Sequence, residues 1–404
     1  MSAAIPTASD VVIVGGGPVG LVNALALGRE GVTVRVIEAQ TDVSDEPRAM
    51  VYNWSVLDGL EPLGLLEDAK RRGFVSQNVH YLVLATGEAV DLDFTILEGK
   101  ADHPYNLHLG QDKMVRLLLE HLKQHPNVTI EWGTKVTSLE QDADGVTVTA
   151  EGPTGSRVFR GGWAIGTDGA RSTVRKQLGI EFEGLTWPHR FVATNVRIDL
   201  GSRGYRPVTY QVDPKYGAVV SQIDTTGLWR VTYCEDSALP DEGVGDRIPD
   251  FFRAMLGEDV DYGLELYSAY RMHQRVAQTL RVGRVVLAGD AAHATNPTSG
   301  FGLTSGLYDT YALYPTLAAI IRGEASPDLL DVYSEDRRQA FLNIVSPVST
   351  ETKRIIFVDD PERLGQDLAE LRRVAASPEL QLTKFMAGRA IGTPTPVDQQ
   401  LASA

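Results

Sequence analysis

The chain has 404 residues, 43% of them hydrophobic and 23% charged, which is enough sequence for two folded domains. Its formal net charge of −15 argues against binding nucleic acid, and its single cysteine, Cys234, excludes an intramolecular disulfide and a cysteine-rich metal cage. No segment is long and apolar enough to span a bilayer, and the N-terminal residues lack the pattern of a secretory signal, so we expect a cytoplasmic protein.

The N-terminal segment has the pattern of a βαβ unit. Residues 11–14 form an apolar run ended by glycines, as in a parallel strand that is buried on both faces. A helix is expected from Pro18 to Arg29, where Gly31 ends it. Residues 32–37 then form a second apolar strand, which ends at Glu38.

The rest of the chain changes between helical and strand patterns. Between residues 191 and 235, runs of Val, Tyr, Thr and Ile alternate with Gly, Pro and Asp turns, which is typical of an antiparallel sheet. The tail after Gly392 is rich in Pro, Thr and Ala and is expected to be loose. Helices are predicted over residues 113–123, 303–321, 329–343 and 362–375, and further strands within 128–151, at 163–165 and at 285–288.

A glycine-rich turn joins the first strand to the first helix. Gly15-Gly16-Gly17-Pro18-Val19-Gly20 is a G-x-G-x-x-G sequence, with Glu38 about 20 residues further on. Gly15 permits the tight turn, Gly17 lets a pyrophosphate approach the backbone, and Gly20 lets helix and strand pack closely. The helix N-terminus attracts the anion, and Glu38 accepts the ribose hydroxyls. The turn predicts a dinucleotide site but does not distinguish FAD from NAD.

Two later motifs decide between these cofactors. Gly166-Thr167-Asp168-Gly169-Ala170-Arg171 and Gly289-Asp290-Ala291-Ala292-His293 each place an aspartate between an apolar strand and a helix. In this order, with the glycine turn, the chain resembles the flavoprotein aromatic hydroxylases, the family of p-hydroxybenzoate hydroxylase. The resemblance implies that Asp290 holds the ribitol hydroxyls of FAD and that Asp168 and Arg171 lie near the pyrophosphate. Taken singly, either aspartate is explained as well by capping a helix.

The same resemblance implies further cofactor contacts. Arg48 corresponds to an arginine that contacts the cofactor, Gln111 to a glutamine that contacts the flavin, and Val136 to a strand position whose backbone meets the adenine. Without the resemblance, these residues read as a solvated loop arginine, a polar residue near a helix start and a core valine.

The segment from Pro297 to Thr304 resembles the family's Pro-x-x-Gly-x-Gly-x-Asn, which opens the helix beneath the isoalloxazine ring. The positive end of that helix is suited to the negative edge of reduced flavin. Thr304 departs from the usual asparagine, which leaves the contacts at the pyrimidine edge open. The residues expected at the flavin are Gly300, Phe301, Gly302, Leu303 and Thr304, with Pro297 expected beside the substrate.

The resemblance implies an NAD(P)H- and O2-dependent monooxygenase. NADPH or NADH reduces FAD, O2 adds to give a C4a-hydroperoxide, and its distal oxygen hydroxylates a small, electron-rich aromatic substrate. Tyr210, Trp229 and Tyr233 lie on the predicted antiparallel sheet and are candidates for the substrate pocket, although aromatic strand residues are commonly core. The sequence leaves open the substrate, the choice of NADH or NADPH, a catalytic base and the oligomeric state, for which a homodimer is one option.

Other functions fit the same cofactor motifs. An FAD-dependent reductase or dehydrogenase shares the fold and differs in its oxygen dependence, and a flavin-bearing protein that only binds an aromatic ligand would not consume NAD(P)H. A flavin halogenase is disfavoured because no Trp-x-Trp-x-Ile-Pro sequence is present. His121 and His125 lack an H-E-x-x-H context, so we expect a solvated helix face there and no metal site.

Together these patterns predict an α/β protein built on a doubly wound, Rossmann-like FAD-binding domain. We assign residues 1–75, 105–180 and 275–340 to that domain. A mostly antiparallel β domain for the substrate is expected from residues 76–104 and 181–274, and a helical C-terminal region from residues 341–404.

Overall fold

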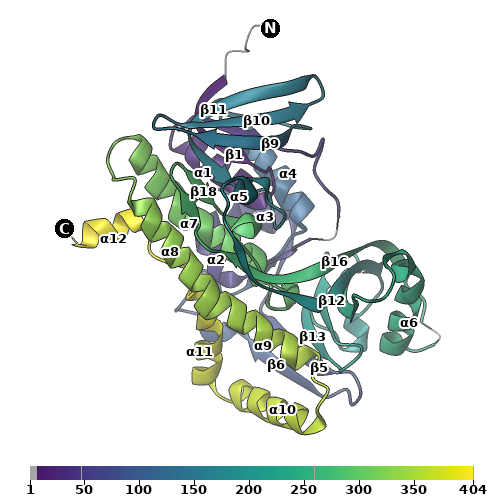
Figure 1. Cartoon of the computed structure of the whole chain (residues 1–404). Helices are drawn as coiled ribbons and strands as arrows, with labels where there is room; N and C mark the ends of the chain where they lie inside the picture. Colours follow the sequence, from purple (N-terminus) through teal and green to yellow (C-terminus); the bar gives the residue numbers. More distant parts are fainter. Residues whose placement is uncertain (1–6, 47, 259, 404) are drawn as a thin grey trace.

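The computed structural model describes residues 7–46, 48–258 and 260–403, which form three β-sheets and a set of helices (Figure 1). The predicted α/β class is confirmed, with a doubly wound sheet, a second and mainly antiparallel sheet, and C-terminal helices. Within the described residues no helix is both long enough and apolar enough to cross a membrane.

The first sheet contains the predicted βαβ unit. β1 pairs in parallel with β2 on one side and with β11 on the other, and β11 pairs in parallel with β18. The order is β17 (Arg281–Val282), β18 (Val285–Leu287), β11 (Gly155–Gly166), β1 (Thr7–Val14), β2 (Val34–Ile37) and β8 (Val128–Glu131). β10 (Val146–Gly152) and β9 (Lys135–Gln141) extend antiparallel from β11.

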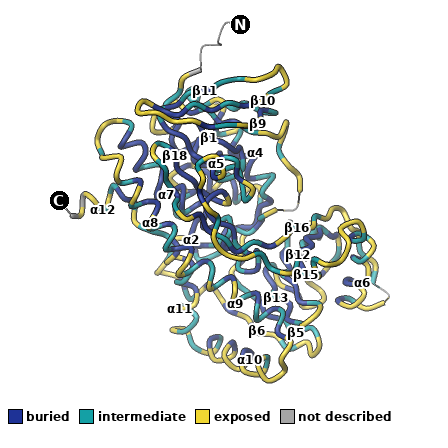
Figure 2. The backbone as a smooth tube through the Cα atoms, viewed as in Figure 1, coloured by how far each residue is buried: buried dark blue, intermediate teal, exposed yellow. Residues whose placement is uncertain are grey.

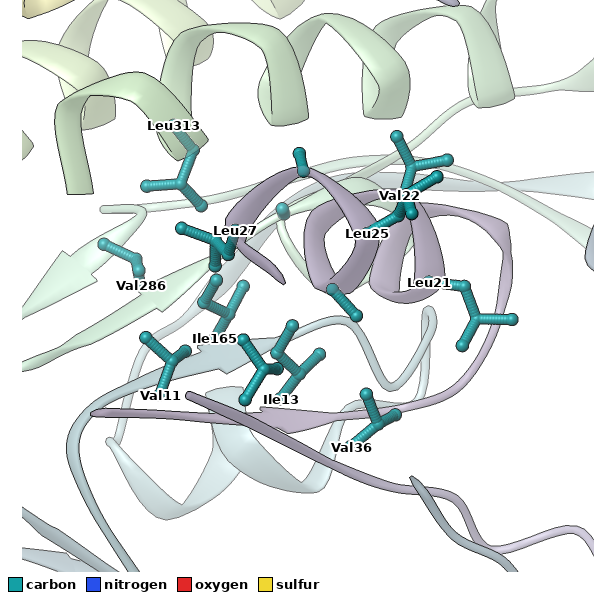
Figure 3. Packing of buried hydrophobic residues seen from close by; sticks show 14 of the residues in the cluster. Val11, Ile13, Leu21, Val22, Leu25, Leu27, Val36, Ile165, Val286 and Leu313 are labelled. Carbon is teal, nitrogen blue, oxygen red and sulfur yellow. The ribbon is translucent and has the colours of Figure 1, made fainter. Parts of the chain in front are cut away.

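Helices pack against this sheet, and their packing explains the apolar strands. α1 (Pro18–Arg29), exactly as long as predicted, packs against α4 (Gln111–Leu122) and α7 (Phe301–Ile321). Figure 3 shows side chains of α1 lying over Val11 and Ile13 of β1. Both strand residues are fully buried, and each such aliphatic side chain contributes roughly 1.5–3 kcal/mol to stability.

The second sheet is mainly antiparallel, and β13 and β5 are its parallel neighbours. Its longest strands, β12 and β16, pair with each other and reach towards the first sheet, where β16 also pairs with β19. α6 (Val244–Leu256) packs on one face. The order is β19 (His293–Ala294), β16 (Gly263–Ala277), β12 (Phe182–Arg197), β15 (Leu228–Asp236), β14 (Ala218–Gln222), β13 (Val208–Val212), β5 (Asn78–Val83) and β6 (Ala89–Asp93).

A small third sheet consists of β3 (Val51–Tyr52), β7 (Asn106–His108) and β4 (Phe74–Ser76). His108 connects it to the second sheet, because its Nδ1–H donates to the Gln222 carbonyl of β14 at 2.9 Å. Its Nε2 then accepts from the Ser76 hydroxyl at 2.8 Å. Both bonds can form with the neutral imidazole, and burial lowers the pKa of His108 to about 4, so the ring is neutral at neutral pH.

Helices form the C-terminal part of the chain, and Figure 2 shows their outer surfaces exposed. A π-helical turn at residues 341–345 joins α8 to α9, which ends the predicted 329–343 helix at Ala340. The remaining helices of this description are α2 (Trp54–Leu60), α3 (Leu66–Arg72), α5 (Thr173–Gln177), α8 (Leu329–Ala340), α9 (Ser346–Ile356), α10 (Pro361–Ala375), α11 (Pro378–Arg389) and α12 (Pro396–Ser403).

The prediction of a loose tail after Gly392 is wrong, because α12 forms there and contacts α7 and α8. The Asp398 amide donates to the Thr395 hydroxyl at 3.2 Å, and that hydroxyl donates to the Asp398 carboxylate. Pro396 follows the capping threonine at the first helical position. The prediction rested on composition alone and did not consider this capping sequence, which marks the start of a helix.

We predict that His108 makes stability fall in mild acid. The unfolded chain takes up a proton near pH 6.5 and the folded chain only near pH 4. As the pH falls between these values, protonation favours the unfolded state and lowers the free energy of unfolding by on the order of 3 kcal/mol. Above pH 6.5 both states are neutral and the effect is absent. In His108→Gln, the drop in the free energy of urea unfolding from pH 7 to pH 5 should shrink; an unchanged drop would contradict this role.

Candidate active site

One cavity of about 510 Å³ opens where the first sheet, the second sheet and α11 meet. It brings together predicted residues from segments far apart in sequence. The predicted residues on its wall are Gly17, Pro18, Val19, Arg48, Gln111, Tyr210, Asp290, Pro297, Gly300, Phe301, Gly302 and Leu303. Gly15, Gly20, Glu38, Val136, Asp168, Arg171, Trp229, Tyr233 and Thr304 lie outside that wall.

The surroundings of Gly17 and Gly20 fit the separate roles predicted for these two glycines of the turn. A Cβ on Gly20 would lie 2.0 Å from the Gly15 carbonyl oxygen, so this glycine is needed for the contact between turn and helix. A Cβ on Gly17 would meet nothing within 4 Å, because that position faces the cavity. Glu38 lies beside the turn, where its carboxylate accepts from the Gly16 amide at 2.5 Å and from the Gln40 amide at 2.7 Å.

Asp290 presents a free carboxylate to the cavity. It stands on a 3-10 turn, Gly289–Ala291, directly after β18. Its side chain is open to the cavity but deep in the protein, and this depth raises its pKa, against the charges of His293 and Arg48. Among the described residues no protein group donates a hydrogen bond to it. A deep carboxylate without a partner fits the hydroxyls of a polyol such as ribitol.

A network of buried charges lies directly behind Asp290. Asp309 of α7 accepts from the Gly289 amide at 2.8 Å, from His293 Nε2 at 2.7 Å and from Arg337 Nε at 2.8 Å. Burial alone would raise the pKa of Asp309, but the charges of His293 and Arg337 lower it below its usual value. Arg337 also donates to the Ile391 carbonyl at 2.5 Å. The turn that carries Asp290 is therefore fixed by α7, α8 and the C-terminal segment.

The segment from Pro297 to Leu303 brings the start of α7 to the cavity. Gly300 has φ +71°, in the left-handed region, and lets the chain turn from a 3-10 helix, Pro297–Ser299, into α7. The positive end of this 21-residue helix therefore faces the cavity. Thr304 points elsewhere: it is buried, and its hydroxyl donates to the Gly300 carbonyl at 3.2 Å.

Asp168 acts locally as a cap. Its carboxylate accepts from the Ser172 hydroxyl at 2.5 Å and from the amides of Thr173 and Val174 at 2.6 and 3.2 Å, at the start of α5. Its neighbours Thr167 and Gly169 reach the cavity, but Asp168 and the exposed Arg171 do not. The geometry of Asp168 is therefore that of a helix-capping aspartate, the alternative to a cofactor contact.

Arg48, Gln111 and Val136 differ in position. Arg48 lies on the cavity wall, with its guanidinium 2.6 Å from the Glu46 carboxylate. Gln111 also lies there, and its backbone N–H donates to the Ala49 carbonyl at 3.0 Å. Val136 is buried on β9 away from the cavity, in register with Ala150 of β10.

Of the three aromatic residues predicted for the substrate pocket, one lies on the cavity wall and two do not. Tyr210 lies on the cavity wall, where its ring is 5.1 Å from the ring of Tyr81 on the neighbouring strand. Trp229 and Tyr233 share one face of β15, as predicted, but that face packs on α6, where Tyr233 stacks on Phe251 at 3.8 Å. Both are 4% exposed and belong to the core, so they do not line this cavity.

The opposite face of β15 supplies a residue that the sequence analysis missed. Arg230 lines the cavity, donates to Asn195 at 3.0 Å and to the Arg48 carbonyl, and forms no ion pair among the described residues. Burial lowers its pKa to about 10. The available signal was a charged residue between Trp229 and Val231, in the middle of an apolar strand.

Further aromatic residues complete the end of the cavity away from the glycine turn. The ring of Phe94 lies 4.4 Å from that of Phe385 of α11, centre to centre and tilted by 42°, and Trp54 also lies on the wall. Lys384, the residue before Phe385, also lines the cavity. These residues come from three separate segments, so no local pattern in the sequence marked them.

The chain is similar to known flavin-dependent enzymes in sequence and in structure. The sequence model of the FAD binding domain matches residues 8–346. The chain is 43% identical over 385 residues to 6-hydroxy-3-succinoylpyridine 3-monooxygenase of Pseudomonas putida (strain DSM 28022 / S16), covering 92% of this chain and 98% of that protein.

Two solved structures of monooxygenases are also similar to this chain. p-Nitrophenol 4-monooxygenase PnpA from Pseudomonas putida DLL-E4 is 40% identical, with a TM-score of 0.94 over 97% of this chain and 100% of that one. The flavin-dependent monooxygenase PieE, in complex with FAD and substrate, is 27% identical with a TM-score of 0.81, over 96% of this chain and 73% of that one.

We predict that substitutions at two glycines of the turn have different effects, one on FAD retention and the other on the stability of the apoprotein. Gly17→Val should leave the apoprotein folded, because Gly17 has φ −70° and ψ 179° and its side-chain direction is open, but should abolish FAD retention. Gly20→Ala should lower the melting temperature of the apoprotein itself, because of its backbone clash. Flavin-to-protein ratios and thermal unfolding after deflavination measure both, and a fully flavinated Gly17→Val protein would refute the assignment.

We also predict that the buried ion pair is costly to break. Arg337→Met leaves Asp309 charged and without its main cationic partner, which should cost about 3–5 kcal/mol in urea unfolding. The matched control is Arg338→Met, whose half-exposed pair with Glu183 should cost under about 1 kcal/mol. Equal losses in the two variants would show that the network does not stabilise the fold.

Proposed function

Because the chain belongs to the FAD-binding-domain family of FAD-dependent aromatic hydroxylases, we propose that it oxygenates a para-substituted phenol or 6-hydroxypyridine at the substituted carbon. The enzyme is a monooxygenase that uses FAD, NAD(P)H and O2. Two relatives support the narrower substrate class. Their names place the oxygen at position 3 of a 3-succinoylpyridine and at position 4 of p-nitrophenol, which are the ring carbons that carry the substituent.

The proposed reaction balances with the known co-substrates. One atom of O2 forms a bond to the ring carbon para to the hydroxyl, and the other atom becomes water. NAD(P)H supplies two electrons, and the bond between that carbon and its substituent breaks. When the substituent takes the bonding electrons with it, it leaves as an anion and the ring leaves as a quinone. When it leaves them behind, water adds to the electron-poor substituent, which for an acyl group gives a carboxylic acid, and the ring leaves as a diol.

The single observation that carries the proposal is one cavity with a polar end and an aromatic end. At the polar end, Gly17 and the start of α1 would hold the FAD pyrophosphate and Asp290 its ribitol hydroxyls. The start of α7, with Arg48 and Gln111, would hold the flavin. Bound FAD supplies the acceptance of hydride and the activation of O2.

At the aromatic end, this chain's own residues bind and orient the substrate. Tyr81, Tyr210 and Tyr270 line the cavity, and their hydroxyls have no hydrogen-bond partner in the described part of the chain. Burial raises the pKa of all three, to about 12 for Tyr270, so they stay protonated at neutral pH and can donate to a ring hydroxyl. The apolar wall excludes water, and Arg230 favours negative charge at the junction of the two ends.

We extend the proposal to the organisation of the protein. The FAD domain comprises residues 1–75, 105–180 and 275–340, and the substrate domain residues 76–104 and 181–274, of which 1–6, 47 and 259 lie outside the described residues. We propose a cytoplasmic homodimer. The exposed Leu264, Leu266 and Tyr267 on β16 support a contact between copies, which light scattering would test.

We predict that NAD(P)H oxidation by the purified holoenzyme is stimulated by para-substituted phenols and 6-hydroxypyridines, with release of one substituent per O2 consumed. Stopped-flow absorbance, oxygen uptake and product analysis with 18O2 measure this. Matched phenols that carry the substituent meta to the hydroxyl are the control. Hydroxylation of an unsubstituted carbon would overturn the proposed position, and flavin reduction without oxygen insertion would overturn the monooxygenase.

A further inference from the structure

Lys384 is a cation on the cavity wall that has no ionic partner. The charged side chains that line the cavity, within the described ranges, are Arg48, Arg230, Asp290 and Lys384. Lys384 donates no hydrogen bond and forms no ion pair there. Arg48 and Asp290 act on each other electrostatically, whereas the carboxylates that act on Lys384 are Glu351 and Glu370. Lys384 therefore belongs to a separate part of the cavity from the cofactor residues.

Those two carboxylates are already engaged by arginines. Glu351 lies 2.6 Å from Arg354, and Glu370 lies 2.6 Å from Arg373. They leave Lys384 as the uncompensated cation of this region. By surface area the Lys384 side chain is exposed to solvent, but the protein around it still desolvates the ammonium, which lowers its pKa against the action of both carboxylates. An anion bound beside the ammonium would relieve that cost.

The position of Lys384 is fixed because α11 is held to the cavity walls on several sides. The Gly388 carbonyl accepts from the Ser55 hydroxyl at 3.2 Å, and Gln381 accepts from the Asp93 amide at 2.9 Å. The contact between the rings of Phe385 and Phe94, 4.4 Å apart, anchors the residue next to Lys384. Figure 1 places α11 at the end of the molecule away from β9 and β10. A fixed cation beside an aromatic wall is suited to a ligand that is itself aromatic and anionic.

We propose that Lys384 forms an anion-binding subsite at the aromatic end of the cavity, so that the preferred substrates are hydroxy-aromatic compounds with a carboxylate side chain. This inference rests on the proposed function, because it names the charge of the substituent that the active site accepts. The ammonium binds the carboxylate, the tyrosine hydroxyls hold the ring, and α11 acts as the wall that selects the substituent.

Ligand binding to the holoenzyme without NAD(P)H tests the subsite. The probes are 4-hydroxyphenylacetate, its neutral amide and the cationic tyramine, followed by the change in flavin absorbance. In the wild type, the carboxylate should bind about tenfold or more tightly than the amide. Lys384→Met should abolish this preference and leave the affinity for the amide within about twofold. Lys384→Glu should shift the preference to tyramine, and Lys123→Met, at an exposed lysine after α4, should change nothing.

The outcomes separate this inference from the proposed function. A wild-type enzyme that oxidises NAD(P)H with neutral phenols but binds carboxylate and amide equally overturns the subsite alone. Retention of the carboxylate preference in Lys384→Met has the same meaning. Absence of oxygenation with any hydroxy-aromatic compound overturns the proposed function, while the binding series still decides whether Lys384 selects anions.

Discussion

The buried carboxylate of Asp309 is the constraint on which the cofactor end of the site depends. A charge with no exposure to water is tolerated only when cations and amides surround it. Here Arg337 of α8 does so from one side, and the Gly289 amide and His293, from the segment after β18, do so from the other. Any arrangement that satisfies Asp309 must bring β18, α7 and α8 together, and this arrangement leaves the neighbouring Asp290 facing the cavity.

The second large constraint is that the second sheet forms a core with one face and a wall of the cavity with the other. Alternation along β15 sends Trp229 and Tyr233 to a core under α6 and sends Arg230 to the cavity. The sheet therefore has a hydrophobic core of its own, which stabilises its strands without filling the space above them. The cavity exists because this second face is covered by the first sheet and α11 instead of by tightly packed side chains.

The local parts of the fold could be predicted from sequence, and the parts decided by distant contacts could not. The glycine turn and α1 were predicted to the residue, because strand, turn and helix signals lie within a short segment. Period-two alternation showed that Trp229 and Tyr233 share a face, but only α6, formed by residues 244–256, decides which face is core. Lys384 and Phe385 could not be placed at all, since α11 reaches the cavity only through tertiary packing.

Charge is distributed unevenly between the surface and the cavity. The chain as a whole carries −15, yet the charged side chains on the cavity wall within the described residues are three cations and one carboxylate. The start of α7 adds a positive helix end to the same space. In a partly enclosed site of low dielectric, such an excess attracts anions more strongly than the same charges would on the surface. FAD brings a negatively charged pyrophosphate, so the cavity favours its cofactor electrostatically, while the acidic exterior disfavours the polyanions that compete for basic sites elsewhere.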